Sequence, residues 1–120
     1  MGHTNYINNK PAFTDKQWEA FSAEVKTLLD NSVVPLAGWD GEGKPTFSNE
    51  SIEFNGVGED SHETASVSKE SASFEFCKTA QKPYDEVVVA FYKLIRKYLP
   101  ATVLSSDGDE ENNPVFPLVD

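Results

Sequence analysis

Two amphipathic helical patterns, separated by a long stretch with the alternation of β-strands, constrain the fold of this chain most strongly. In the first pattern, apolar residues recur at steps of three and four, which places them on one face of a helix. Its members are Trp18, Phe21, Val25, Leu28 and Leu29. The second stripe is broader and predicts the main core helix. Its members are Tyr84, Val88, Phe91, Ile95 and Tyr98.

The helix ends are marked by residues with known capping chemistry. Thr14 and Gln17 have the spacing of a capping box, in which each side chain satisfies a free backbone N–H at the helix start. We therefore expect the first helix to begin at Thr14 and to end near Asn31, with Asn31 in a left-handed conformation. Pro83 suits the first position of the second helix, because proline lacks the N–H that this position leaves unpaired. Pro100 is expected to end that helix.

The residues between the two helices favour short strands. Residues 33–39 read as a strand that lies at an edge or starts late, because Pro35 cannot donate a ladder hydrogen bond. Ile52 and Phe54 alternate with polar neighbours, which is typical of a half-buried strand. After the second helix, residues 102–106 read as a last strand.

Residues 64–68 and 72–78 are predicted to form a hairpin around the turn 69–71. In this interpretation Phe74 and Phe76 lie on the core face, and Glu75 and Cys77 lie on the other face. The assignment rests on the alternation of side chains along a strand, in which successive residues point to opposite faces.

This order of elements predicts an α+β fold, with a mainly antiparallel sheet of about four or five short strands and two helices packed on one face. Residues 1–13 are polar and are expected to form a flexible N-terminal arm, and residues 14–120 a single domain. The pair Gly2-His3 resembles a cloning remnant, so His3 is given no role.

The charge of the chain restricts its partners. Twenty acidic residues face ten basic ones, which gives a formal net charge of −10. Such a surface repels phosphate backbones and anionic lipid, so no nucleic acid and no membrane partner is expected. A basic protein partner fits better. The alternative is that the charge serves solubility alone.

Cys77 is the only cysteine, so neither an intramolecular disulfide nor a cysteine zinc cluster can form. A lone cysteine without an evident signal peptide predicts a reducing, cytoplasmic location. A small buried thiol is the commoner role for such a residue, because a nucleophile needs a base within hydrogen-bond reach.

Two acidic loops offer candidate ligand groups. His62 and Glu63 lie in Gly58–Thr64, where one imidazole and several carboxylates would suit manganese or magnesium better than zinc. The alternative is an ordinary exposed histidine. Asp107 and Asp109 lie in a second acidic turn that fails the EF-hand spacing, so at most a weak divalent cation is expected there. No cofactor is otherwise indicated.

Further candidate binding residues fall at strand ends and loop junctions, where binding sites often form on a rigid scaffold. Trp39 and Asp40 border a glycine-rich turn, Lys78 ends a predicted strand, and Tyr84 begins the second helix. Aromatic residues at helical spacing are most often core, which is the alternative for Tyr84. If the sheet brings its strand ends together, the side chains of four residues would converge in one polar cleft. They are His62, Lys78, Asp107 and Asp109.

Residues 76–85 (FCKTAQKPYD) and 105–109 (SSDGD) resemble a family of small uncharacterised proteins of bacteria and bacterial viruses. The segments 38–41, 54–56 and 60–64 match parts of the same pattern. The resemblance implies a bacterial or phage-encoded setting. It assigns no activity, so no catalytic residue is carried over.

Three functions follow as hypotheses. The first is a non-catalytic accessory protein that binds a host or partner protein through its acidic face. The second is a small-ligand or divalent-metal-binding protein, or an enzyme, that uses a polar cleft around His62 and Asp107–Asp109. The third is a virion or assembly component. A structural alternative for the Asp-Gly and Asn-Gly pairs is that they fit tight turns.

Overall fold

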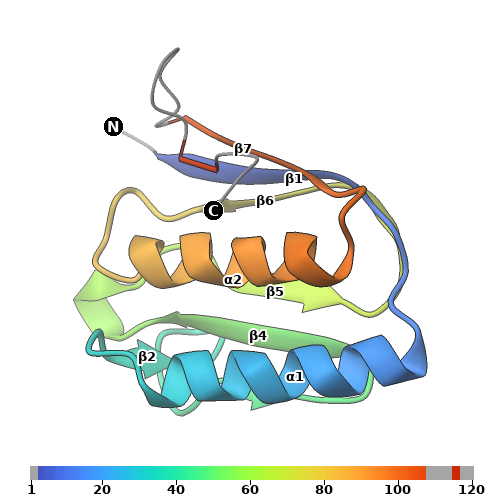
Figure 1. Cartoon of the computed structure of the whole chain (residues 1–120). Helices are drawn as coiled ribbons and strands as arrows, with labels where there is room; N and C mark the ends of the chain where they lie inside the picture. Colours follow the sequence, from blue (N-terminus) through green and yellow to red (C-terminus); the bar gives the residue numbers. More distant parts are fainter. Residues whose placement is uncertain (1–2, 108–114, 117–120) are drawn as a thin grey trace.

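The structure, a computed structural model, describes residues 3–107 and 115–116 (Figure 1). Its helices are α1 (Asp15–Asp30), the single 3-10 turn η1 (Gly58–Asp60) and α2 (Asp85–Tyr98). Its strands are β1 (Thr4–Lys10), β2 (Leu36–Ala37), β3 (Thr46–Phe47), β4 (Ser51–Gly56), β5 (Ala65–Ser68), β6 (Ala72–Lys78) and β7 (Val103–Ser106). The α+β class is confirmed, and the described residues form seven strands where about four or five were expected.

All strand pairs are antiparallel and fall into two sheets. The first sheet has the order β6-β1-β7, and in the second β4 pairs with β2, β3 and β5. Figure 1 shows α2 beneath the first sheet and α1 below β4. The two helices pack against each other, and the rings of Phe21 and Phe91 lie 6.1 Å apart between them. One cluster of buried apolar side chains joins both helices and both sheets.

Helix α1 begins as predicted. The Thr14 hydroxyl accepts a hydrogen bond from the Gln17 N–H (3.1 Å), and the Gln17 side chain accepts one from the Thr14 N–H (2.9 Å). The predicted face is buried at Trp18, Phe21, Val25 and Leu29. The expected left-handed exit is wrong. Asn31 has a φ of −97°, because its N–H bonds back to the last turn without a reversal of the backbone.

Helix α2 begins at Asp85 and is preceded by a turn that contains Pro83, so Pro83 is not its first residue. Its first turn is acidic and its last turn is basic, which complements the helix dipole. Strand β2 follows Pro35 directly, which confirms a late start for that strand. Within the described part of the chain, neither helix has the length and apolarity needed to cross a membrane.

The segment expected to be a flexible arm contains β1, the central strand of its sheet. Ile7 is fully buried and Asn5 is fully buried beside it. Lys10 is only 2% exposed, and its ammonium group donates to the carbonyls of Pro11 and Glu70. The prediction failed because polar side chains in this strand bond to distant partners, Asn5 to Asp85 and Lys10 to Glu70, which the local sequence does not reveal.

The predicted hairpin of residues 64–78 is also wrong in its pairing and its faces. β5 pairs with β4, and β6 pairs with β1. The register sets Cys77 opposite Asn5 on the inner face. It leaves Phe74 and Phe76 on the outer face, 51% and 53% exposed. A shift of one residue exchanges the faces of a strand, and only the pairing partner decides between them.

Replacing Ile7 by alanine tests whether β1 is an integral strand. Removing a fully buried isoleucine side chain should lower the free energy of unfolding by about 2–5 kcal/mol, measured by urea denaturation. Val33→Ala is the matched control, because Val33 is 93% exposed and its truncation should change stability by less than about 0.5 kcal/mol. Equal stability of the two variants would contradict a docked β1.

Candidate functional site

Two loops at one end of the molecule are held together by one buried side-chain amide. Asn55 is 2% exposed, and its Nδ2 donates to the carbonyl oxygens of Trp39 (3.2 Å) and His62 (3.0 Å). Its Oδ1 accepts from the N–H groups of His62 (3.0 Å) and Gly56 (2.8 Å). Both donors and both acceptor positions of this amide are therefore used. The amide fixes the loop after β2 against the loop after β4.

Steric and backbone constraints explain why glycine occupies positions 41 and 56 of these loops. A side chain at Gly56 would place its Cβ 2.2 Å from the carbonyl oxygen of Asp60, so only glycine fits. Gly41 has a φ of +82°, a conformation that L-residues rarely adopt. The Asp40 carboxylate accepts the Glu42 N–H at 3.1 Å, as in an Asx turn. A tight turn therefore accounts for the Asp40-Gly41 pair. Asn55 and Gly56 instead end strand β4, so the turn explanation does not hold for them.

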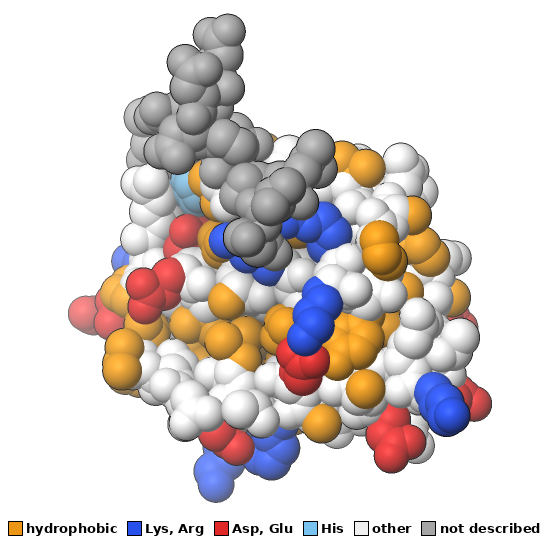
Figure 2. Space-filling view, viewed as in Figure 1, with side chains coloured by type: hydrophobic (Ala, Val, Ile, Leu, Met, Phe, Trp, Pro, Cys, Tyr) orange, Lys and Arg blue, Asp and Glu red, His pale blue; other side chains and the backbone are white. Residues whose placement is uncertain are grey.

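The side chains that these loops expose are aromatic, apolar and acidic. Trp39 is 62% exposed and Val57 is 44% exposed. Residues 38–43 and 57–63 carry five carboxylates and no lysine or arginine. Acidic side chains gather at the left edge of Figure 2, where Figure 1 places the loop after β4. We call the following residues the acidic loop surface: Trp39, Asp40, Glu42, Val57, Glu59 and Asp60.

The two loops are also tied directly to each other. The Gly58 N–H donates to the Gly41 carbonyl at 3.0 Å, and the Thr64 hydroxyl donates to the Trp39 carbonyl at 2.7 Å. The Trp39 carbonyl thus accepts two hydrogen bonds, one from Thr64 and one from Asn55. The backbone beneath the exposed indole is consequently fixed.

Several of the other predicted site residues share this end of the molecule. Glu63 and Lys78 are paired, since the Lys78 N–H donates to the Glu63 carboxylate (2.8 Å) and the Glu63 N–H to the Lys78 carbonyl (3.1 Å). At the end of the β6-β1-β7 sheet, Thr4 lies between Lys78 and Asp107: it pairs with Lys78, and its carbonyl accepts the Asp107 N–H. His62 is exposed.

The predicted polar cleft does not appear in these contacts. Three surface hollows of the described residues are lined by other residues and not by the predicted site residues. Tyr84 is fully buried and its hydroxyl donates to the Glu63 carbonyl at 2.6 Å, so it belongs to the core. Asp109 lies outside the described residues. Within residues 3–107 and 115–116, no three His, Cys, Asp or Glu side chains are grouped to hold a metal ion.

A group of polar side chains that the sequence did not predict lies close to Asp107. We call it the N-terminal polar cluster, and it comprises the buried residues His3, Asn5, Thr79 and Ser106 and the partly buried Asp85. The Asp85 carboxylate accepts from the Asn5 amide (2.8 Å) and the Thr79 hydroxyl (2.6 Å). The N–H groups of Thr79 and Ala80 both donate to the His3 carbonyl. No local pattern could reveal this cluster, because its members are far apart in the chain.

The geometry of this cluster argues against a catalytic triad. The His3 Nε2 atom lies 3.2 Å from the Ser106 hydroxyl and 3.7 Å from the Asp85 carboxylate. A triad needs the hydroxyl and the carboxylate on opposite ring nitrogens, because one nitrogen takes the proton while the other is oriented. Here both groups approach the same nitrogen. The cluster instead fastens β1 to β7 and to the start of α2.

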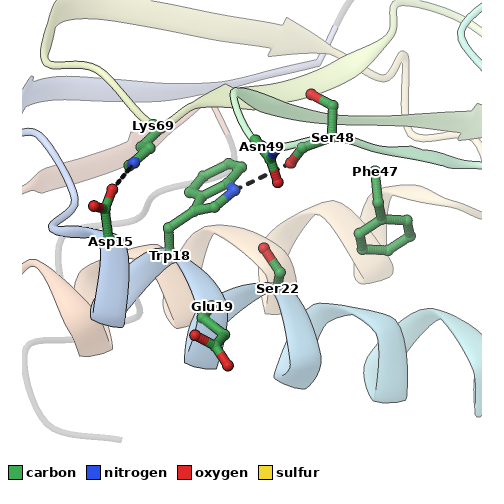
Figure 3. Close-up of a pocket in the computed structure, with 8 residues that line it drawn as sticks. All are labelled: Asp15, Trp18, Glu19, Ser22, Phe47, Ser48, Asn49 and Lys69. Carbon is green, nitrogen blue, oxygen red and sulfur yellow. Dashed lines mark hydrogen bonds and ion pairs between the residues drawn. The ribbon is translucent and has the colours of Figure 1, made fainter.

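One surface hollow, of about 620 Å³, lies between α1 and the β3–β4 turn (Figure 3). Several of its polar groups are already paired. The Trp18 indole donates to the Ser48 carbonyl at 3.1 Å, and Lys69 pairs with Asp15. Figure 3 shows Glu19 and Phe47 at its rim. Because no side chains converge on a common point here, the hollow supports no particular chemistry.

Comparisons with protein-family models, with curated proteins and with solved structures find no match to this chain. The resemblance to bacterial and phage proteins therefore stays a prediction. The function has to be argued from the geometry of the described residues.

The structure predicts that Cys77 is inert in the folded protein. Its side chain is fully buried with its sulfur 3.5 Å from the Glu63 carbonyl, and burial raises the pKa of the thiol to about 12. The thiolate that alkylating reagents need is therefore absent at pH 8. A maleimide at pH 8 should label Cys77 only as fast as the protein unfolds.

The variant Ser73→Cys supplies the control, because Ser73 is exposed on the same strand. This variant should gain one rapidly labelled thiol while Cys77 stays protected, which mass spectrometry of the labelled peptides will distinguish. Rapid labelling of Cys77 under native conditions would contradict its burial and reopen a nucleophilic role.

Proposed function

We propose that this protein is a non-catalytic interaction protein that binds a basic partner protein through the acidic loop surface. The observation that supports this function is the exposure of Trp39. A tryptophan that is 62% exposed leaves a large apolar area in water. Tryptophan is also among the residues that most often dominate the binding energy of protein interfaces.

The fixed backbone around Trp39 favours binding. Its carbonyl accepts hydrogen bonds from the buried Asn55 amide and from Thr64, so the indole projects from a loop that is ordered before any partner arrives. Binding through such an anchor loses less conformational entropy than binding through a mobile loop. Val57, exposed on the neighbouring loop, adds apolar area.

The charge around the indole defines the partner. The two loops carry five carboxylates without a lysine or arginine, in a chain whose net charge is −10. This distribution attracts a partner with a basic rim and repels polyanions such as nucleic acid. On the resemblance to bacterial and phage proteins, the partner would be a host protein in the cytoplasm of a bacterial or phage-infected cell.

Replacing Trp39 by alanine tests this function. The wild-type protein and Trp39→Ala are immobilised, bacterial proteins retained by the wild type are identified, and each one is titrated as a purified protein by calorimetry. Loss of a central tryptophan should weaken binding at least about 30-fold, which corresponds to about 2 kcal/mol. Val33→Ala is the control for an exposed apolar side chain elsewhere, and it should bind as the wild type does.

The charge contribution is tested with two double variants that remove the same charge. Glu42→Gln with Glu59→Gln should weaken binding and flatten its salt dependence, because steering depends on local charge. Glu19→Gln with Glu50→Gln, both exposed elsewhere, should do so much less. Partners that bind Trp39→Ala as tightly as the wild type would refute the proposed function.

A further inference from the structure

The outer face of the β6-β1-β7 sheet is apolar and uncovered by any described helix or strand. Phe74, Phe76 and Val103 are each about half exposed there, at 51%, 53% and 51%. The Phe74 ring lies 6.1 Å from that of Tyr6 and 5.8 Å from that of Phe76. Figure 1 shows α2 on the inner side of this sheet. A sheet surface that faces solvent is ordinarily polar. These exposed apolar side chains therefore indicate that another molecule covers this face.

On this face, side-chain size decreases from β6 to β7. β6 presents the large side chains Phe74, Phe76 and Lys78. β7 presents Val103 and Ser105, and the strand is followed by Asp107. β1 lies between them, with Tyr6 opposite both Phe76 and Ser105. Each row across the sheet therefore runs from a larger side chain to a smaller one.

The same face is neutral although the chain is strongly acidic. Its charged groups among the described residues are Lys78 on the β6 side and Asp107 on the β7 side, both in the row of Thr4. Asp107 belongs to the outer face because its carboxylate accepts the Tyr6 hydroxyl at 2.8 Å. A copy of a chain with net charge −10 can approach such a face with the least repulsion.

We infer that this face binds a second copy of the chain, in a two-fold dimer whose axis runs parallel to β1. Such an axis lays β6 of one protomer over β7 of its partner. Phe74 then lies against Val103 of the partner subunit, and Phe76 against Ser105 of the partner subunit, so large side chains meet small ones. The two Tyr6 side chains meet at the axis. Two sheets packed in this way lie about 10 Å apart with strands within about 30° of parallel.

Charge selects this axis over its alternative. Lys78 faces Asp107 of the partner subunit, and by symmetry the same pair forms a second time. A two-fold axis across the strands would instead set Lys78 against Phe74 of the partner subunit and leave the ammonium group without a carboxylate. An unpaired charge in an interface is costly, so the axis along β1 is favoured.

The size of the face sets the strength of the dimer. Stable interfaces bury roughly 800 Å² on each partner, and three short strands present less than that. The dimer is therefore weak and forms as protein concentration rises. The acidic loop surface is carried by other segments, so this inference does not depend on the proposed function.

Sedimentation equilibrium across a series of protein concentrations tests the dimer. The wild type should pass from monomer to dimer. Phe76→Ser should raise the dissociation constant at least about tenfold, because it removes an aromatic ring from the centre of the interface. Phe47→Ser is the matched control, since Phe47 is 39% exposed on β3, and it should leave the dissociation constant unchanged. A wild type that stays monomeric at every concentration would overturn the inference.

Two charge-reversed variants test the axis. Lys78→Glu alone and Asp107→Lys alone should each weaken self-association, because each sets like charges together twice. An equimolar mixture of the two should restore the dimer, since both pairs become opposite in the mixed species. Circular dichroism checks folding, because Asp107 also accepts from the Thr4 N–H and Tyr6.

The remaining outcomes are also decisive. A mixture of folded variants that does not recover association would overturn the axis along β1. If Asp107→Lys does not fold, Lys78→Glu decides, and an unchanged dissociation constant for that variant would likewise overturn it. A face that binds a different protein while the chain remains monomeric would reject the second copy as its occupant.

Discussion

The Asp85 carboxylate joins three segments that no local contact would bring together. It accepts hydrogen bonds from Asn5 on β1 and from Thr79 at the end of β6, and it lies at the first turn of α2. A carboxylate there is favoured by the helix dipole, and hydrogen bonds to a charged group contribute more than neutral ones. Because β1 lies between β6 and β7, holding its first residues in place also positions the last strand. The Asp85 carboxylate therefore adds a side-chain anchor to the backbone pairing that holds the three-stranded sheet together.

The buried Asn55 amide has the same role at the loop end of the second sheet. It makes four hydrogen bonds to backbone groups of two loops, and it is 2% exposed. An unsatisfied buried amide is costly, so a fully satisfied one specifies a single loop arrangement. The glycine at position 56 has a different cause, because the Asp60 carbonyl occupies the space that a side chain would need. Conspicuous polar motifs can thus serve the scaffold, while the exposed Trp39 beside them is left for binding.

The sequence predicted those parts of the fold that local physics determines. Helical periodicity and the Thr14–Gln17 capping box located α1, because the apolar stripe and the cap are formed by residues close together in the sequence. Strand β1 escaped prediction because Asn5 and Lys10 are polar, and their partners are residues that lie far away in the chain. The faces of β6 were assigned in reverse, because Phe and Cys both read as core residues and only pairing with β1 decides which set points inward. The exposed Trp39 was among the candidate site residues, whereas His3 and Asp85 were not, since only tertiary contact groups them.

The reversed faces of β6 bear on the proposed self-association as well as on the failed prediction. Burying Phe74 and Phe76 would have given an ordinary core strand, yet the fold buries the Cys77 thiol and most of Glu75 instead, and burial raises the pKa of both groups. Keeping two aromatic rings in water while a carboxylate is largely buried lowers the stability of the isolated chain. A sequence that exchanged these positions would be more stable as a monomer. Covering the outer face in the proposed dimer would remove these two rings from water. That physical argument links the stability of this sheet to association.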